Sequence, residues 1–474
     1  MLIYTSFQRG VFMLKLPKER MDYLANELIK YETDSNAEVH QKALEELREK
    51  MIKISNIVKE KGNTIAYQTE RIKTIDSFIR KQNRNKNKGL NIDYEDMHDI
   101  IGVRIICLTL SDVWEFVKEV QSSSQFKVLE ERDYINNPKK SGYKSYHILV
   151  GYPITVESTV YNIKAEIQIR TIFMDVFARE EHKINYKGDC SEEDKIKLSN
   201  LSKKLAYYDW SLDNQFKVKK LIPTLENEKE LSPYRIEYEK VEYIFGMVYN
   251  YIKPIIEKSI DEFELKDDVL HFVHGIKKLE SIKRKMVKRH LECTADNMLH
   301  SLRDVVRYKV VCTDEATAKK YIEFLTEKLK ENELIANIET SDHLDIPKES
   351  GYRGYKINAS YNMPFVTGSA ITVEILIRTM VMDAWALHND KIFNDEEARN
   401  KYKEPFSGLS ESLHDAETTI EIIKESNKNN RTIEDDDLLE QVRDYIKSKE
   451  EGDSPEGNPP SAPAQARLVL KNGK

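Results

Sequence analysis

The sequence predicts an α/β (α+β) protein made of two tandem domains, each a mixed β-sheet wrapped by helices. The first observation is an internal repeat, because four peptides recur in the same order about 200 residues later. They are RIKTIDSFIRK and GIKKLESIKRK (71–81, 275–285), DIIGVRIIC and DVVRYKVVC (99–107, 304–312), SGYKSYH and SGYRGYK (141–147, 350–356), and AEIQIRTIFMDVFA and VEILIRTMVMDAWA (165–178, 373–386). The second observation is that both copies mix helical with strand periodicity. Together they indicate a tandem duplication.

The elements of one copy can be placed from their periodicity. Apolar residues at three- and four-residue spacing predict a helix over 44–58. The run IIGVRIICL (100–108) is short and β-branched, which is typical of a buried strand. Polar and apolar residues alternate in AEIQIR (165–170), which predicts a further strand. In the second copy, Pro254 is expected to kink or interrupt a helix over 241–258.

A chain of 474 residues suggests two domains and a tail. The expected order is a leader, a first domain, a connector, a second domain and a tail that is acidic and then rich in Pro and Gly. Their bounds are 1–20, 21–217, 218–234, 235–428 and 429–474. The composition of the tail predicts disorder.

Composition limits the class of protein. The net charge of −7 argues against a general nucleic-acid binder, although RKQNRNKNKG (80–89) is a local basic stretch. Cys107, Cys190, Cys293 and Cys312 have no CxxC spacing, which predicts free thiols in a reducing cytoplasm. The N-terminal stretch lacks the apolar run of a membrane span. A cytoplasmic protein that does not enter the membrane is expected.

Two acidic residues stand out because each belongs to a predicted strand region. Asp99 directly precedes IIGVRIICL, and Glu166 lies in AEIQIR. A pair of carboxylates on neighbouring strands is suited to Mg²⁺, which completes its shell with phosphates and water. Each could instead be a solvent-facing residue or an ion-pair partner.

Basic and aromatic residues surround these two in the sequence. The basic ones are Arg71, Lys73, Arg80, Lys81, Arg84, Arg104, Lys139, Lys144 and Arg170. Phosphates in transfer need such charge, although a solvated basic helix face is the simpler explanation. Tyr143 and His147 offer a stacking ring and a proton donor or acceptor, or else a turn tyrosine and a core histidine. No Walker loop or kinase signature is present, so the phosphate chemistry would be of another kind.

Four motifs of the first copy, taken together, resemble one family. They are D-I-x-G-x-R-I from Asp99, R-D-Y-I-x-x-P-K-x-S-G-Y-x-S-Y-H ending at His147, E-I-Q-I-R-T-x-x-M from Glu166, and E-H-x-x-N-Y-K from Glu181. This series is similar to the synthetase domain of RelA/SpoT homologues, and most similar to the small alarmone synthetases. The resemblance covers about residues 65–215. It implies a nucleotidyltransferase-like fold in both copies.

The resemblance also implies an activity, a cofactor and a set of site residues. The reaction would move the β,γ-pyrophosphate of ATP to the 3′-hydroxyl of GDP or GTP, with Mg²⁺. Asp99 and Glu166 would be the catalytic and metal-binding residues. The ATP-binding residues would be Arg71, Lys73, Ser77, Lys81, Arg84 and Arg104, with Arg71 and Arg104 around adenine. The GDP- or GTP-binding residues would be Lys139, Tyr143, Lys144, His147, Gln168, Arg170, Asp175 and Asn185.

The second copy keeps only part of this set. Retained counterparts are Lys277, Lys285, Asp304, Lys348, Tyr352, Glu374 and Arg378. Gly275 replaces Arg71, Lys309 replaces Arg104, Lys356 replaces His147, Leu376 replaces Gln168, and Arg307 replaces Gly102. A lysine cannot supply the flat stacking surface of a guanidinium group. The second copy is therefore interpreted as a degenerate synthetase that serves regulation or assembly.

Other functions stay open at this point. The acceptor could be an adenine nucleotide or the 3′ end of tRNA, as in toxin-like relatives, or the chain could be a catalytically silent nucleotide-binding protein. The expected partners are ATP and GDP or GTP, an allosteric nucleotide in the second copy, and further copies of the chain in a homo-oligomer. The acidic balance disfavours nucleic acid, while the stretch 80–89 keeps tRNA or single-stranded RNA open.

Overall fold

The chain was analysed as a computed structural model. It describes residues 16–32, 34–87, 89–90, 94, 97–186, 191–214, 228–344, 346–363, 370–392, 396–427 and 438–452. The chain forms two compact units, which are treated separately here. The helical unit comprises Met1–Val39, Lys73–Ile100 and Thr432–Lys474, and the sheet unit comprises His40–Ile72 and Ile101–Arg431. The domain predicted for 21–217 thus contributes to both units.

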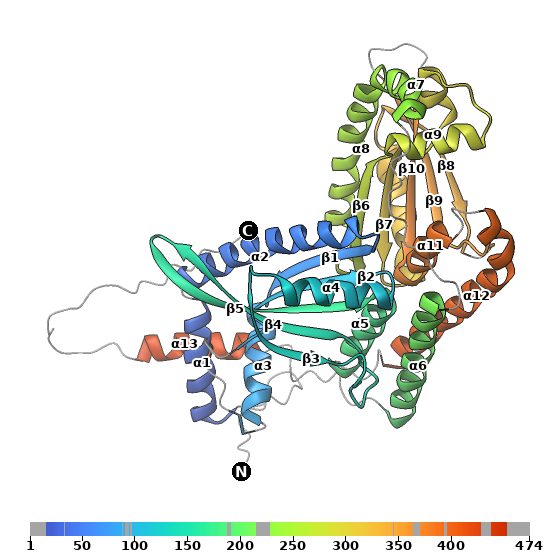
Figure 1. Ribbon diagram of the computed structural model, residues 1–474. Helices are drawn as coiled ribbons and strands as arrows, with labels where there is room; N and C mark the ends of the chain where they lie inside the picture. The colour runs from blue at the N-terminus through green and yellow to red at the C-terminus, as the bar shows by residue number, and fades with distance from the viewer. Residues whose placement is uncertain are drawn as a thin grey trace. The chain divides into compact units, whose positions relative to one another are not determined.

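Three helices pack together in the helical unit (Figure 1). They are α1 (Lys18–Glu32), α3 (Ile75–Asn87) and α13 (Leu438–Gly452). Arg20 Nε donates to Asn83 Oδ1 at 2.8 Å, and Tyr445 Oη donates to Asp22 Oδ1 at 2.9 Å. The predicted disorder of the tail is therefore wrong for residues 438–452. Buried Leu438 and Val442 explain the difference, because they give this segment an apolar face to pack.

The first half of the chain supplies a five-stranded mixed sheet to the sheet unit. Its strands are β1 (Ile65–Ile72), β2 (Ile101–Cys107), β3 (Lys127–Asp133), β4 (Tyr146–Val156) and β5 (Thr159–Thr171). The order is β1-β2-β5-β4-β3, in which only β2 and β5 run parallel. The helices are α2 (Asp34–Glu60), α4 (Leu110–Ser122), α5 (Ile172–Tyr186) and α6 (Glu192–Asn214). The periodicity that predicted the helix over 44–58 and the strand over 165–170 is confirmed.

The second half repeats this topology, with the order β6-β7-β10-β9-β8. Its strands are β6 (Val269–Ile276), β7 (Val306–Cys312), β8 (Ile335–Asp342), β9 (Tyr355–Asn362) and β10 (Ala370–Thr379). Its helices are α7 (Glu228–Glu239), α8 (Glu242–Glu262), α9 (Leu279–Lys288), α10 (Glu315–Lys330), α11 (Met380–Ile392) and α12 (Glu396–Asn427), with short turns η2 (Lys266–Asp268) and η3 (Asn297–Ser301). Two identical strand orders confirm the predicted duplication and fold class.

Two expectations about helices need comment. Helix α8 runs through Pro254 without a break, so the proline does not interrupt it. The predicted connector 218–234 lies outside the described residues up to 227, and its last part begins α7 at Glu228. No helix in the described part of the chain is both long enough and apolar enough to cross a membrane.

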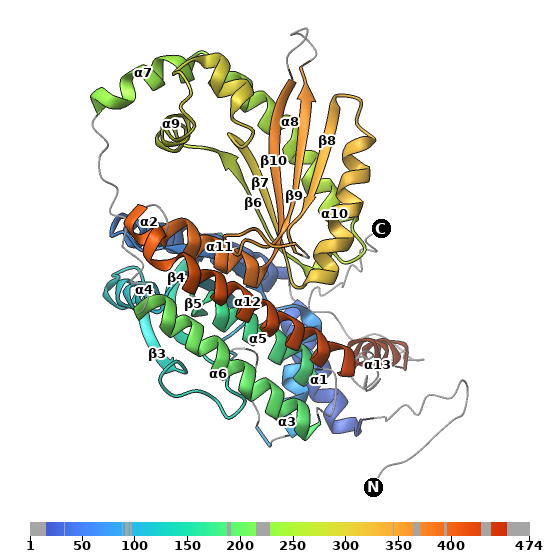
Figure 2. The same cartoon turned by 90° about the vertical axis from the view of Figure 1, so that its right-hand side faces the viewer.

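The two halves share one hydrophobic core within the sheet unit. Phe173 and Leu205 of the first half belong to the same buried cluster as Trp385 and Leu413 of the second. Helices α5, α6, α11 and α12 lie side by side there (Figure 2). Burial of this apolar surface stabilises the pairing of the two repeats.

The two repeats also meet through matching residues. The rings of Tyr67 on β1 and His271 on β6 stack with centroids 3.9 Å apart and an interplanar angle of 2°. These residues occupy equivalent positions near the start of equivalent strands. The repeats therefore pack against each other in the manner of a two-fold pair.

Candidate active site

One face of the first sheet carries the predicted polar residues. Arg71 pairs with Gly102 across β1 and β2, and Gly102 lies beside Glu166 of β5. In the same register Arg104 lies beside Gln168. Directly paired residues project to the same face of a sheet, so these side chains share one surface. A Cβ built on Gly102 would meet only the Glu166 carbonyl oxygen, at 3.8 Å, so the strip between Arg71 and Glu166 is open.

Four of the predicted acceptor-binding residues form a closed ring of hydrogen bonds with Glu166. His147 Nδ1 lies 2.9 Å from Glu166 Oε1, and His147 Nε2 lies 2.9 Å from Tyr143 Oη. Arg170 Nη2 donates to Tyr143 Oη at 2.6 Å and to Gln168 Oε1 at 2.7 Å. Gln168 Nε2 donates to Glu166 Oε2 at 2.7 Å, which closes the ring. Glu166 is therefore held through both carboxylate oxygens.

The protonation states in this ring follow from its surroundings. Burial lowers the pKa of His147 below its ordinary value, and this effect outweighs the opposing effect of Glu166. The imidazole is thus neutral at pH 7, and beside a carboxylate its proton belongs on Nδ1. Nε2 then accepts a hydrogen bond from the Tyr143 hydroxyl. Glu166 accepts hydrogen bonds through both oxygens, and its side chain is 20% exposed, which leaves it open to an incoming group.

Asp175 does not lie where a base could reach it. Its side chain is 0% exposed. Its Oδ1 is 3.0 Å from Arg170 Nη1 and 3.2 Å from Arg104 Nη1, and its Oδ2 is 2.6 Å from Arg179 Nε. Burial acts to raise the pKa of Asp175, but the three arginines outweigh it and set the pKa to about 2. The predicted role of Asp175 in binding GDP or GTP is not supported, since both of its oxygens contact arginines instead.

Only one of the two predicted lysines, Lys139, lies against the ring of Tyr143. Lys139 Nζ lies 4.6 Å from the centroid of the Tyr143 ring, and Arg170 Cζ lies 5.2 Å from it. Lys144 lines a different hollow, together with Phe177 and Asp209. The structure therefore brings Lys139, but not Lys144, to the ring of Tyr143.

The predicted phosphate-binding residues form a second group, which belongs to the helical unit. Asp99 Oδ2 lies 3.0 Å from Lys73 Nζ, and its Oδ1 lies 2.7 Å from Lys81 Nζ. Burial acts to raise the pKa of Asp99, but the two lysines outweigh it and the pKa lies below its ordinary value. Ser77 accepts a hydrogen bond from Thr74 at the start of α3, and Arg84 is exposed further along this helix. The carboxylate of Asp99 is ionised, with its side chain 24% exposed.

Some residues of the site were missed or cannot be placed. Asn185 belongs to α5, but its side chain lies outside the described residues. Arg179 was not predicted, although its position four residues after Asp175 on a helix would place the two side chains together. Ser145 was also missed, and it receives a hydrogen bond from Arg170 Nε at 3.1 Å.

The second half keeps the acidic group but opens the ring. Asp304 pairs with Lys277 and, at 2.5 Å, with Lys285, as Asp99 does with Lys73 and Lys81. Burial acts to raise the pKa of Asp304, but the two lysines outweigh it and set the pKa to about 2. At the other end of the site, Lys356 Nζ pairs with Glu374 Oε2 at 2.7 Å.

The remaining side of this second ring is incomplete. Arg378 Nε donates to Tyr352 Oη at 3.2 Å, and Lys348 Nζ lies 5.0 Å from the Tyr352 ring. Leu376 has no polar atom with which to join Arg378 to Glu374. Glu374 is consequently not held through both oxygens in the way that Glu166 is.

An arginine and a glycine have exchanged places between the halves. The cross-strand pair Arg71–Gly102 of the first sheet corresponds to Gly275–Arg307 of the second. Both arginines are exposed. Lys309, the counterpart of Arg104, pairs with Asp383 at 2.7 Å. The second sheet therefore presents its guanidinium group from the neighbouring strand.

One family of known proteins matches both halves of the chain. The model of the region found in RelA and SpoT proteins matches residues 70–191 and 274–404. GTP pyrophosphokinase YwaC of Bacillus subtilis strain 168 is 40% identical over 129 residues, which cover 26% of this chain and 60% of YwaC. GTP pyrophosphokinase YjbM of the same strain is 36% identical over 175 residues, which cover 36% of this chain and 82% of YjbM.

A solved relative is the small alarmone synthetase 1 from Bacillus subtilis bound to its product pppGpp. It shares 32% identity, and the match covers 37% of this chain and 92% of that chain, with a TM-score of 0.35. The chain spans less than two thirds of the length of YwaC. The two regions matched by the family model together cover more than half of the 474 residues. The predicted resemblance is thus confirmed, and the chain belongs to the RelA/SpoT family, whose region it carries twice.

Proposed function

We propose that the first half transfers the β,γ-pyrophosphate of ATP to the 3′-hydroxyl of GDP or GTP. The observation that supports this function best is the closed ring that holds Glu166 through both carboxylate oxygens. A fixed, ionised carboxylate is the group that a hydroxyl acceptor needs as a general base. The relatives YwaC and YjbM are named GTP pyrophosphokinases, which agrees with the proposal.

In the proposed reaction Glu166 takes the proton of the 3′-hydroxyl. The 3′-oxygen then forms a bond to the β-phosphorus of ATP, and the bond from that phosphorus to the α,β-bridging oxygen breaks. AMP leaves with the bridging oxygen, and the pyrophosphate remains on the acceptor. Most of the barrier reduction in such transfers comes from positioning and from neutralising charge.

The guanine base of the acceptor nucleotide would stack on Tyr143, over whose ring Lys139 lies in this structure. Lys139 is exposed and can swing toward the acceptor phosphates, which would uncover the ring. The hydroxyl of Tyr143 would stay in the ring of hydrogen bonds with His147 and Arg170. Tyr143 would thus orient the guanine base, while the hydrogen-bond network of its hydroxyl keeps Glu166 in place.

ATP would be bound by the two arginines of the sheet and by the cations of α3 and of the segment just before it. Arg71 and Arg104 offer planar guanidinium groups on one face, which suits stacking on adenine. Arg104 is held by Asp175 at 3.2 Å, which fixes its plane before ATP binds. Lys73 and Lys81 would exchange Asp99 for the ATP phosphates, with Ser77 and Arg84 nearby along the chain.

Mg²⁺ fits the residues present, because Asp99 and Glu166 both offer carboxylate oxygens and both are partly open to solvent. These two carboxylates would hold it, and the ion would neutralise charge on the phosphates during transfer.

The second half would act in assembly and regulation, and the structure offers two supports for this. It buries the α5–α6 surface of the first half in a shared core, as a partner subunit would. It also keeps Asp304 with two lysines and an exposed Arg307, a set that could hold a nucleotide as an effector. A cytoplasmic setting and a homo-oligomer remain part of the proposal.

An acceptor panel tests this function. Full-length protein is incubated with labelled ATP and Mg²⁺ plus GDP, GTP, AMP, unlabelled ATP or tRNA, and the products are resolved by chromatography. We expect labelled ppGpp and pppGpp from GDP and GTP, and no labelled product with the other acceptors. Product formed only from an adenine nucleotide or tRNA would replace the acceptor assignment, and no product with any acceptor would overturn the synthetase function.

A further inference from the structure

Three metal-ligating side chains meet in the second half, outside the nucleotide site. They are Glu315, His414 and Glu417, whose carboxylate oxygens and imidazole nitrogen all lie within 4.8 Å of one another. His414 Nδ1 lies 2.8 Å from Glu315 Oε1. Ligand atoms that each lie about 2.0–2.2 Å from one ion are themselves only a few ångströms apart. Small side-chain rotations would therefore bring all three residues onto one ion.

Two helices position these residues. His414 and Glu417 are three residues apart on α12, so they project from the same face of that helix. Glu315 is the first residue of α10, directly after the N-cap residue Asp314. Each ligand is therefore carried by a helix, and its backbone is already ordered before an ion binds.

Burial of Glu417 is the observation that points to a ligand. Its side chain is 5% exposed, and among the described residues neither of its oxygens has a partner at hydrogen-bond distance, although Thr379 lies close to it. An isolated buried carboxylate is costly unless it is paired or binds a metal.

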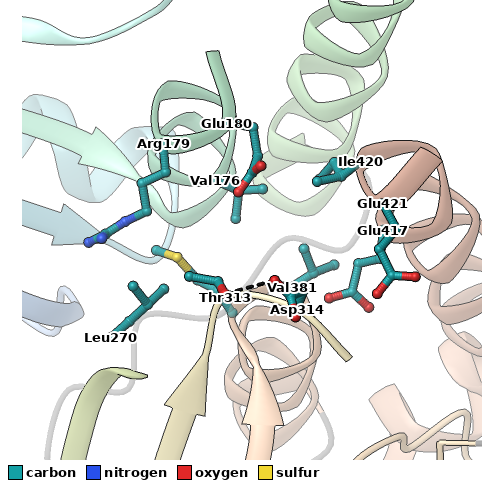
Figure 3. Close-up of a pocket in the computed structure, with 11 residues that line it drawn as sticks. Val176, Arg179, Glu180, Leu270, Thr313, Asp314, Val381, Glu417, Ile420 and Glu421 are labelled. Carbon is teal, nitrogen blue, oxygen red and sulfur yellow. Dashed lines mark hydrogen bonds between the residues drawn. The ribbon is translucent and has the colours of Figure 1, made fainter. Parts of the chain in front are cut away.

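The adjoining hollow has the charge that a cation requires. It is lined by the carboxylates of Glu180, Asp314, Glu417 and Glu421 (Figure 3). Arg179 is the one basic residue among the described residues that line it. Its guanidinium group points away from Glu417 in Figure 3 and is bound to Asp175. The local balance of charge is thus strongly negative.

We propose that Glu315, His414 and Glu417 form a site for a divalent transition-metal ion of the Zn²⁺ class. One imidazole nitrogen and two carboxylate oxygens are a donor set that Zn²⁺ accepts, with a fourth position left for water. Mg²⁺ prefers oxygen ligands alone, so the histidine favours a transition metal over the ion of the nucleotide site. Glu315 and His414 are partly exposed, which gives an ion a path from solvent.

This site belongs to the second half alone. Leu110 and Glu315 are the first residues of equivalent helices, α4 and α10. Asp209 corresponds to Glu417, because each follows an equivalent strand-end threonine, Thr171 or Thr379, by 38 residues. Ala206 therefore occupies the position of His414. Two of the three ligands are missing from the first half, which supplies natural replacement residues for a test.

The test uses equilibrium dialysis of full-length protein against Zn²⁺ with excess Mg²⁺ present, followed by elemental analysis of the bound metal. His414→Ala and Glu315→Leu introduce the residues that the first half already tolerates at these positions, and His300→Ala is the control. We expect wild type and His300→Ala to bind one more Zn²⁺ per chain than the other two variants. Outer-shell changes alone cost about 10- to 100-fold in affinity, so loss of a ligand should weaken binding at least about 100-fold.

Two further readouts make the outcome decisive. Co²⁺ in place of Zn²⁺ should give the weak visible bands of a nitrogen and oxygen site, and strong charge transfer from thiolates would place the ion at cysteine instead. Zn²⁺ should raise the thermal midpoint of wild type and His300→Ala, but not that of Glu315→Leu, whose folding is checked by circular dichroism. Equal Zn²⁺ binding by all four proteins would overturn the proposal.

Discussion

The two halves of the chain share one sheet topology and differ in how firmly they hold the central glutamate. In the first half Glu166 is fixed by His147 and Gln168, within a ring that also includes Tyr143 and Arg170. In the second half Leu376 interrupts the ring, and Glu374 pairs with Lys356 instead. A cation that binds the carboxylate directly competes with an incoming proton or metal. The same fold can therefore keep a carboxylate in place while losing the hydrogen-bond network that surrounds it.

The aspartate that binds two lysines, in contrast, is arranged alike in the two halves. Asp99 and Asp304 each hold two lysines from equivalent positions, and both have a lowered pKa. The charged group of one aspartate and two lysines thus survives in both halves, whereas the organisation around the glutamate survives in one. If the proposed function holds, a few substitutions on the sheet face would be enough to separate nucleotide binding from catalysis.

The largest expected effect comes from removing the base in each half. Glu166→Gln should lower the turnover of alarmone synthesis by about 100- to 10,000-fold, which is the usual contribution of a general base. Glu374→Gln is the matched change in the second half, and it should leave turnover within about twofold, because Lys356 already neutralises that carboxylate. Both rates are measured with saturating ATP and GTP. Equal losses in the two variants would show that both halves catalyse the reaction.

The next effect concerns stability and tests the buried carboxylate that organises the arginines. Asp175→Asn leaves Arg104, Arg170 and Arg179 without their common partner. Removing one member of a buried ion pair costs about 3–5 kcal/mol, so the urea midpoint at pH 7 should fall clearly. Asp76→Asn weakens a partly exposed pair with Arg80 one turn along the same helix, and it should change stability by no more than about 1 kcal/mol.

The pH dependence of the same variant follows from the sign of the shift. The pKa of Asp175 is about 2 in the folded protein, below the ordinary value of 3.8. A lowered pKa stabilises the folded state above pH 4, and this stabilisation is lost as the pH falls from about 4 toward 2. The gap between wild type and Asp175→Asn should therefore narrow over that range. A gap that stays constant down to pH 2 would mean that Asp175 is not ionised in the folded protein.

Much of the fold could be predicted because periodicity and repetition are local properties of the sequence. The repeat, the strand over 165–170 and the helix over 44–58 all appear as expected. Helix α13 was missed because the tail was judged by composition, and its apolar residues Leu438 and Val442 are few. Pro254 does not interrupt α8, because tertiary packing can outweigh the low helix propensity of proline, and Phe245, Ile252 and Ile256 of this helix are fully buried.

The site was predictable in composition and less so in geometry. Glu166, Gln168 and Arg170 alternate along one strand, and their shared face follows from sequence alone. The ring that joins them to Tyr143 and His147 depends on the register between β4 and β5, which only the structure supplies. The role of Asp175 was misassigned for a similar reason, since full burial of a carboxylate depends on tertiary packing. Glu315 and His414, about 100 residues apart in sequence, carry no local signal of a shared site.

The smallest expected effect concerns the exchange of arginine and glycine between the sheets, and it tests whether the second half has truly lost its adenine site. Arg71→Gly removes one planar cation from the first sheet, and a cation–π contact is worth about 0.5–2 kcal/mol, so the KM for ATP should rise about 2- to 30-fold. The double variant Arg71→Gly with Gly102→Arg reproduces the Gly275–Arg307 pair of the second sheet within the first. We expect it to remain as weak as the single variant or weaker, because a side chain at position 102 fills the open strip beside Glu166. Steady-state kinetics with varied ATP measures both. If the double variant recovers the wild-type KM, an arginine on either strand can serve adenine, and Arg307 would then have to be counted as a working half of a clamp in the second copy.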